Sequence, residues 1–158
     1  MALETERKFL VKGEYKKDAF KAMRIRQGYL AHTALCSVRI RIRDDKGFIT
    51  VKGKTDKAGM TRYEWEKEIP AKEAEELLLL ATPGMIDKCR YLVRNTDGVH
   101  TWEVDEFYGE NEGLTVAEIE LGSEDEAFDK PDWLGNEVTG DPRYFNSALR
   151  NNPYKYWK

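Results

Sequence analysis

The sequence has little of what marks several large classes of protein. Its two cysteines, Cys36 and Cys89, are too few for a disulfide framework and lack the spacing of a metal-binding pair, so we expect free thiols. The longest apolar run, at 77–81, is too short to span a membrane, and the charged first residues do not resemble a signal peptide. A net charge of -3 lacks the basic excess of a non-specific nucleic-acid binder. We therefore predict a cytoplasmic protein with no membrane segment and no specific nucleic-acid partner.

The chain is long enough to bury a core. With 158 residues, we expect one domain over residues 1–158. Charged residues make up 35% of the chain, but 11% aromatic residues argue against disorder. The two histidines, His32 and His100, match no ligand spacing, and we expect both at the surface or in turns.

Alternating apolar and polar residues indicate a protein built mainly from strands. Strands are predicted at 3–11, 27–33, 36–43, 47–54, 61–69, 86–95, 99–108 and 114–122, with hairpin turns at 44–47 and 96–98. Helices are predicted at 14–24, at 71–81 before the stop signal Pro83–Gly84, at 142–150, and after Ser123, whose spacing to Glu126 is that of a capping box. This pattern favours an antiparallel barrel or sandwich, and we predict an α+β fold in which helices pack outside an eight-stranded antiparallel β-barrel.

The charges on the predicted strands are sorted by sign. The polar faces of 36–43 and 47–54 are basic, whereas those of 99–108 and 114–122 are acidic. A solvated outer face is the ordinary explanation for charges on one strand. A solvated surface normally mixes the two signs, however, because like charges opposite one another destabilise a sheet. If helices cover the apolar faces, the charged faces line a closed lumen, which in an eight-stranded barrel holds one small ligand.

The charges in such a lumen predict phosphate chemistry. The planar guanidinium of arginine suits phosphate oxygens. Glu4, Glu6 and Lys8 share one face of the first strand, where carboxylates about 7 Å apart repel unless a cation lies between them. Magnesium prefers such oxygen ligands. A basic cradle, carboxylates and a metal are the components of phosphoryl-transfer sites.

The segment Glu4-Thr5-Glu6-Arg7-Lys8 resembles the ExExK signature of the CYTH superfamily, the triphosphate tunnel metalloenzymes. The motifs RIR, VKGK, RYEWE, KCRY, EVDEF and EIEL follow in the order of that family, and the chain is similar to its short bacterial members over nearly its whole length. The resemblance implies an eight-stranded tunnel that binds a triphosphate inside and requires Mg²⁺ or Mn²⁺.

The resemblance also implies a role for each charged face. Glu4, Glu6 and Glu118 would bind a first metal, and Glu6 and Glu120 a second one that activates water. The implied phosphate cradle comprises Lys8, Arg39, Arg41, Lys52, Lys54 and Arg90, with Arg43, Arg62 and Lys88 as further members. The remaining tunnel-lining acids are Glu64, Glu66, Glu103 and Asp105. Of all these residues, Glu6, Glu120, Lys8, Arg39 and Arg41 are the expected catalytic ones. Tyr29 lies where a gating tyrosine could sit, although an aromatic residue beside Gly28 is more often a packing residue.

We predict a divalent-metal-dependent triphosphatase that hydrolyses a linear triphosphate. Few residues remain to build a base-specific pocket, which favours inorganic tripolyphosphate. The alternatives are a class IV-type adenylate cyclase, a thiamine triphosphatase, and a polyphosphate-binding module without turnover, because fold alone does not fix the reaction. The expected partner is this small-molecule substrate, and the protein itself is either a monomer or a homodimer.

Overall fold

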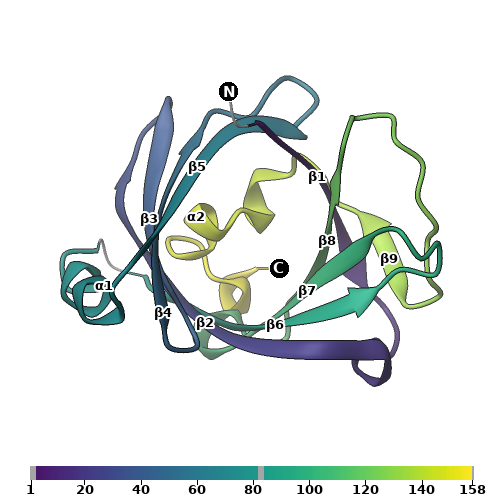
Figure 1. Cartoon of the computed structure of the whole chain (residues 1–158), viewed down its shortest axis with the longest axis horizontal. Helices are drawn as coiled ribbons and strands as arrows, with labels where there is room; N and C mark the ends of the chain where they lie inside the picture. The colour runs from purple at the N-terminus through teal and green to yellow at the C-terminus, as the bar shows by residue number, and fades with distance from the viewer. Residues whose placement is uncertain (1–2, 82–83, 158) are drawn as a thin grey trace.

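The computed structural model describes residues 3–81 and 84–157, and its centre is a closed antiparallel barrel (Figure 1). The strands of this part of the chain are β1 (Leu3–Val11), β2 (Ala19–His32), β3 (Cys36–Arg43), β4 (Lys46–Gly53), β5 (Thr61–Ile69), β6 (Ile86–Arg94), β7 (Thr101–Phe107), β8 (Thr115–Leu121) and β9 (Leu134–Glu137). Their order is β5-β4-β3-β2-β6-β7-β8-β1-β9, and pairing of β1 with β5 closes the ring of the first eight. The predicted eight-stranded barrel is confirmed, with β9 added alongside the end of β1.

The predicted helix over 14–24 is wrong. Only a 3₁₀ turn, η1 (Lys16–Asp18), is helical there. β2 starts at Ala19, where it pairs with β6, and it also pairs with β3 from Ile25 onward. Met23 and Ile25 are buried, whereas Arg24 between them is exposed, which is the period of a strand. The pairing with β6 that begins at Ala19 outweighs the weak local helical pattern.

The other helices are short. They are α1 (Ala71–Leu78), η2 (Gly109–Asn111), η3 (Pro142–Tyr144), α2 (Asn146–Leu149) and η4 (Tyr154–Tyr156). The helix predicted at 71–81 is therefore confirmed but shorter, while its stop residue Pro83 lies outside the described residues. The segment 142–150 forms two short pieces, and the Asp141 carboxylate accepts a hydrogen bond from Arg143 N at the start of η3. No helix follows Ser123: Glu126 N donates to the Ser123 carbonyl within a turn.

The apolar core lies outside the ring of strands rather than within it. Ala74 and Leu78 of α1 cover Ile40 and Ile42 on the outer side of β3. The segment at 123–134 covers the opposite wall, where the buried side chains cluster as Phe9, Tyr15, Val93, Trp102, Val104, Ala117, Ile119, Leu121, Trp133 and Leu134. Trp65 of β5 is 43% exposed.

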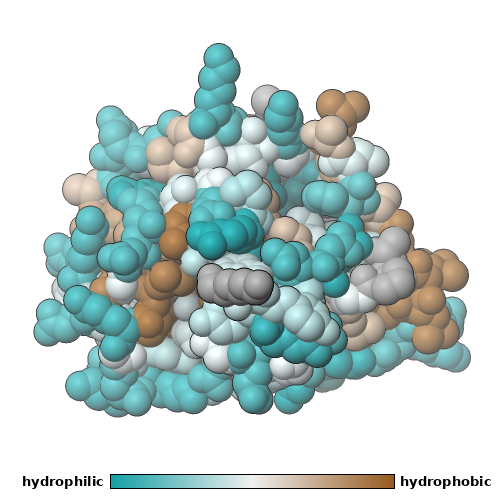
Figure 2. Space-filling view, turned by 180° about the vertical axis from the view of Figure 1, so that it is seen from behind, coloured by the Kyte–Doolittle hydropathy of each residue, from teal (hydrophilic) through white to brown (hydrophobic). Residues whose placement is uncertain are grey.

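The C-terminal segment closes the arrangement differently from the prediction. The prediction placed all helices outside, but α2 lies across the opening of the ring (Figure 1). Tyr144 and Leu149 anchor this segment in an apolar cluster with Ile86, Phe107 and Leu114 at one end of the barrel. The face seen in Figure 2 is mainly hydrophilic, with hydrophobic residues in separate patches. Within 3–81 and 84–157, no helix is both long and apolar enough to cross a bilayer.

His100 lies in the loop between β6 and β7, in keeping with the expected surface or turn position, and it ties this hairpin to the segment that covers the barrel. Its Nδ1 lies 2.7 Å from Asp97, and its Nε2 is hydrogen-bonded to Glu126. The bonds to Glu126 and then to Asp97 raise the pKa of His100 above its usual value.

We therefore expect His100→Gln to destabilise the protein more at pH 6 than at pH 9. A raised histidine pKa stabilises the fold fully below the unfolded value of about 6.5, and this stabilisation is lost as pH rises through the folded value. Thermal unfolding between pH 5.5 and 9 measures this difference. His32→Gln, at an exposed position, is the matched control. An equal loss at all pH values would show that the ion pairs contribute nothing.

Candidate active site

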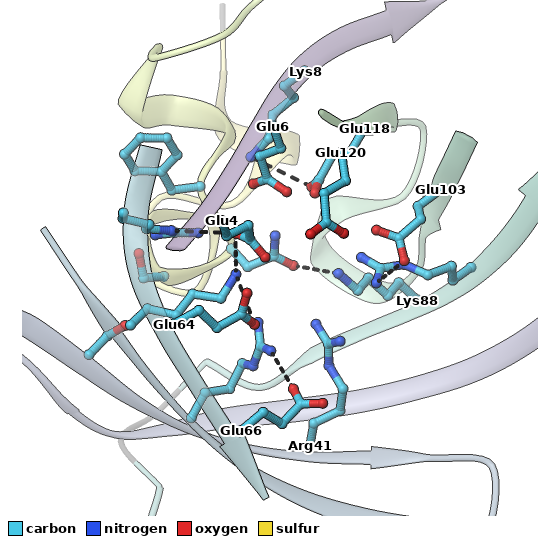
Figure 3. Close-up of a pocket in the computed structure, with 18 of the residues that line it drawn as sticks. Glu4, Glu6, Lys8, Arg41, Glu64, Glu66, Lys88, Glu103, Glu118 and Glu120 are labelled. Atoms are coloured by element: carbon cyan, nitrogen blue, oxygen red, sulfur yellow. Dashed lines mark hydrogen bonds and ion pairs between the residues drawn. The ribbon is translucent and has the colours of Figure 1, made fainter. Parts of the chain in front are cut away.

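The barrel encloses a cavity of about 250 Å³ whose walls are almost entirely charged (Figure 3). It is lined by Glu4, Glu6, Lys8, Tyr29, Ser37, Arg39, Arg41, Arg43, Lys52, Arg62, Glu64, Glu66, Lys88, Arg90, Glu103, Glu118, Glu120, Phe145, Asn146 and Ser147. The structure therefore brings together every predicted site residue except Lys54 and Asp105.

Two neighbouring strands supply the acidic wall. β1 pairs with β8 so that Glu6 lies opposite Glu120 and Lys8 lies opposite Glu118. Alternate side chains of a strand share a face, so Glu4 joins Glu6 and Lys8 on the cavity side of β1 (Figure 3). Like charges directly opposite one another destabilise a sheet. A cation beside these carboxylates would therefore be stabilising.

Carboxyl pKa values along this wall reflect the crowding. Burial, followed by the negative charges of Glu118 and Glu4, raises the pKa of Glu6 well above its usual value. Burial and then the charge of Glu4 also raise the pKa of Glu120. Glu118 behaves differently: burial would raise its pKa, but the charges of Lys8, Arg90 and Lys88 together outweigh burial and hold the pKa well below its usual value. Much of the wall thus lacks the positive charge needed to ionise it fully.

The chemistry of the acidic wall fits a divalent cation. Crowded carboxylate oxygens are the ligands that hard ions such as Mg²⁺ and Mn²⁺ prefer. Within the described residues, no three acidic, histidine or cysteine side chains already converge as a complete metal site. Mg²⁺ does not need such a cage, because one or two carboxylates commonly hold it together with water and substrate phosphate oxygens.

The facing wall is basic and poorly compensated. Arg39 and Arg41 of β3 are each only 6% exposed. Nη2 of Arg39 donates to Thr50 Oγ1 at 3.3 Å, but its buried Nε has no hydrogen-bond partner among the described residues. Burial and the charges of Arg39 and Arg90 lower the pKa of Arg41 to about 9. A bound anion would satisfy the unpaired donor and relieve the crowding of positive charge.

Asp105 lies behind the basic wall, so the prediction that it lines the cavity is wrong. It is 1% exposed, and its carboxylate accepts hydrogen bonds from Lys88 Nζ and Arg90 Nε, each at 2.8 Å. Arg90 is the register partner of Asp105 on the neighbouring strand, and its side chain covers the carboxylate. Asp105 thus holds two cavity cations in place from beneath.

Lys54 is also misplaced by the prediction. β4 ends at Gly53, so the alternation of side chains that points Lys52 into the barrel stops before Lys54. Lys54 is exposed and lines a separate groove beside the barrel, shared with Lys52 and Arg62.

Several residues around the cavity carry no charge and were missed. Phe145, Asn146 and Ser147 reach it from the C-terminal segment. Nζ of Lys8 donates to the Tyr144 carbonyl at 3.4 Å and lies 5.2 Å from the centre of the Phe145 ring. No sequence pattern distinguishes these residues, since only the long-range return of the chain brings them to the site.

Tyr29 is both buried and part of the cavity wall. The guanidinium carbon of Arg150, on the C-terminal segment, lies 5.4 Å from the centre of its ring. Tyr29 therefore packs within the fold and also lines the cavity.

Comparison with known proteins agrees with this geometry. The family model described as the CYTH domain matches residues 2–145. The chain belongs to the CYTH domain family. This CYTH domain is 52% identical over 159 residues to an inorganic triphosphatase from Acetivibrio thermocellus, covering 100% of this chain and 99% of that protein. It is 39% identical over 151 residues to an inorganic triphosphatase from Nitrosomonas europaea, covering 92% and 95% of the two chains.

A solved structure supports the same relationship. The crystal structure of an inorganic triphosphatase superposes on this CYTH domain with a TM-score of 0.69 and 35% identity, covering 95% of each chain. The barrel is therefore the fold of a known family.

Proposed function

We propose that this CYTH domain hydrolyses inorganic tripolyphosphate inside its barrel, with Mg²⁺ or Mn²⁺ as cofactor. The observation that carries the proposal is the enclosed cavity in which a basic wall faces a carboxylate wall. Two relatives named inorganic triphosphatase, each similar to this chain over more than nine-tenths of its length, support the same reaction.

The dimensions and lining of the cavity favour an inorganic substrate over a nucleotide or thiamine derivative. Its volume of about 250 Å³ is below the roughly 300–1,000 Å³ common for small-molecule pockets. Tyr29 and Phe145 are its only aromatic residues within the described part of the chain, which leaves little apolar surface for stacking a base. A compact polyanion is the ligand that these walls match.

The basic residues bind the substrate and stabilise the leaving group. Arg39 offers its unpaired Nε to a phosphate oxygen, and Arg41 and Lys88 add positive charge beside it. Water attacks the terminal phosphorus in line, the bond from that phosphorus to the bridging oxygen breaks, and diphosphate leaves together with inorganic phosphate. The cavity cations neutralise the charge that develops on the leaving oxygen, which is the largest contribution in phosphoryl transfer.

The acidic residues are assigned to the metal. Glu4, Glu6 and Glu118 would hold one divalent cation, and Glu6 and Glu120 a second. When bound, such cations neutralise phosphate oxygens and lower the pKa of water. The carboxylate wall would hold the metal, while the basic wall on the other side of the cavity binds the phosphate oxygens of the substrate.

A substrate panel tests the proposal. We expect phosphate release from tripolyphosphate to exceed that from thiamine triphosphate, ATP and pyrophosphate, and EDTA to reduce it to background. With ATP, we expect free phosphate and no cyclic AMP. Cyclic AMP with pyrophosphate would instead identify a cyclase. Background release from every substrate with both metals would identify a binding module.

A further inference from the structure

The C-terminal segment contributes polar side chains to the interior of the barrel. Asn146 begins α2, which lies across the ring opening (Figure 1), and it lines the cavity. The fully buried Leu149, three residues on, anchors α2 in the apolar cluster at the barrel end. The position of Asn146 is therefore set by packing rather than by its own contacts.

The side chain of Asn146 meets two groups from the barrel wall. Its Oδ1 accepts a hydrogen bond from Lys88 Nζ at 3.0 Å and another from Gln27 Nε2 at 3.2 Å. Gln27, on β2, is fully buried, and its Oε1 accepts a hydrogen bond from Arg41 Nε at 2.8 Å. Two neutral amides thus form a continuous bridge from one cavity cation to another.

A neutral partner suits Arg41, whose positive charge then stays available for a ligand, whereas Lys88 also pairs with the carboxylate of Asp105. An amide oxygen satisfies a buried N–H donor without neutralising the cation. A carboxylate in the same place would compete with phosphate for that charge. Because Nε2 of Gln27 is held by Asn146, the glutamine oxygen is fixed toward Arg41, and the guanidinium has less freedom to turn away from the substrate.

We propose that Gln27 and Asn146 are positioning residues, which hold Arg41 and Lys88 in the orientation that binds triphosphate and so couple the C-terminal segment to the site. This inference rests on the proposed function. It adds two uncharged residues from opposite ends of the chain to a site otherwise recognised by its charges.

A double-mutant cycle with Gln27→Met and Asn146→Ala tests the bridge. Methionine preserves the shape of the buried glutamine, and Asn146 is only half-buried, so both variants should fold. We expect kcat/KM for tripolyphosphate to fall about 10- to 100-fold in each, through a higher KM as well as a lower kcat, because misplacement of binding groups by about 1 Å costs as much. In the double variant, the loss should be at least about threefold smaller than the product of the single losses, since the residues share one network.

Asn151→Ala is the matched control, an exposed asparagine in the same segment, and should leave kcat/KM unchanged. Wild-type kcat/KM in both single variants, or strictly multiplied losses in the double variant, would overturn the bridge.

A binding measurement separates this inference from the proposed function. Tripolyphosphate in EDTA should raise the unfolding temperature of the wild-type protein and raise that of each single variant less. If the wild-type protein shows no turnover, the proposed function fails, and this thermal shift alone decides the bridge. Equal shifts in wild type and variants would overturn it. If Gln27→Met does not fold, Asn146→Ala and Asn151→Ala supply the same comparison.

Discussion

Glu6→Gln is expected to lower tripolyphosphate turnover more than about 100-fold. Substitution of residues that only hydrogen-bond to metal ligands already lowers metal affinity or activity about 10- to 100-fold. Glu6→Gln should also leave the metal-free protein at least as stable as the wild type. Burial and the charges of Glu118 and Glu4 raise the pKa of Glu6, which means that its ionised form destabilises the fold. This penalty grows as pH rises through the folded pKa, and a neutral glutamine removes it.

Phosphate release and thermal unfolding at neutral pH check both halves of this prediction. In EDTA, the unfolding temperature of Glu6→Gln should equal or exceed that of the wild type, while the stabilisation by added Mg²⁺ or Mn²⁺ should be smaller. Glu73→Gln, at an exposed position of α1, is the control for loss of one carboxylate. Full turnover in Glu6→Gln would contradict its assignment, and a lowered unfolding temperature in EDTA would contradict the repulsion between the carboxylates.

The charged interior could be predicted because a strand alternates between two faces. Once Phe9, Trp102 and Ile119 are placed outside the barrel, the charged residues between them must point inward. The alternation alone does not show which face of a strand other segments of the chain will cover. Sorting of the charges by sign supplied that information here, and the covering segments α1 and 123–134 confirm it.

The parts that could not be predicted depend on contacts distant in sequence. The first part of β2, at 19–24, fits a helical pattern locally and becomes a strand because β6 pairs with it. Gln27 and Asn146 carry no charge, so nothing in their own surroundings marks them, and 119 residues separate the two amides that meet. Lys54 fails for a simpler reason, because β4 ends one residue earlier and the alternation stops with it.

Asp105→Asn is expected to cost about 3–5 kcal/mol of unfolding free energy, the usual loss when one partner of a buried ion pair is removed. Asp105 lies between Lys88 and Arg90, whose side chains are 1% and 10% exposed. Burial alone would raise the pKa of Asp105, but the charges of Arg90 and then Lys88 outweigh it and lower the pKa. Stabilisation by this carboxylate is therefore present at neutral pH and lost as pH falls through the lowered value.

Chemical unfolding at pH 7 measures the loss, with the exposed Asp132→Asn as control. Burial already lowers the pKa of Lys88 to about 7, and without Asp105 its ammonium form becomes harder still to maintain. A polyanion in the cavity would replace the missing negative charge. Tripolyphosphate should therefore raise the unfolding temperature of Asp105→Asn more than that of the wild type. An equal or smaller rise would mean that the substrate does not lie against Lys88 and Arg90, and the assignment of the basic wall would then be wrong.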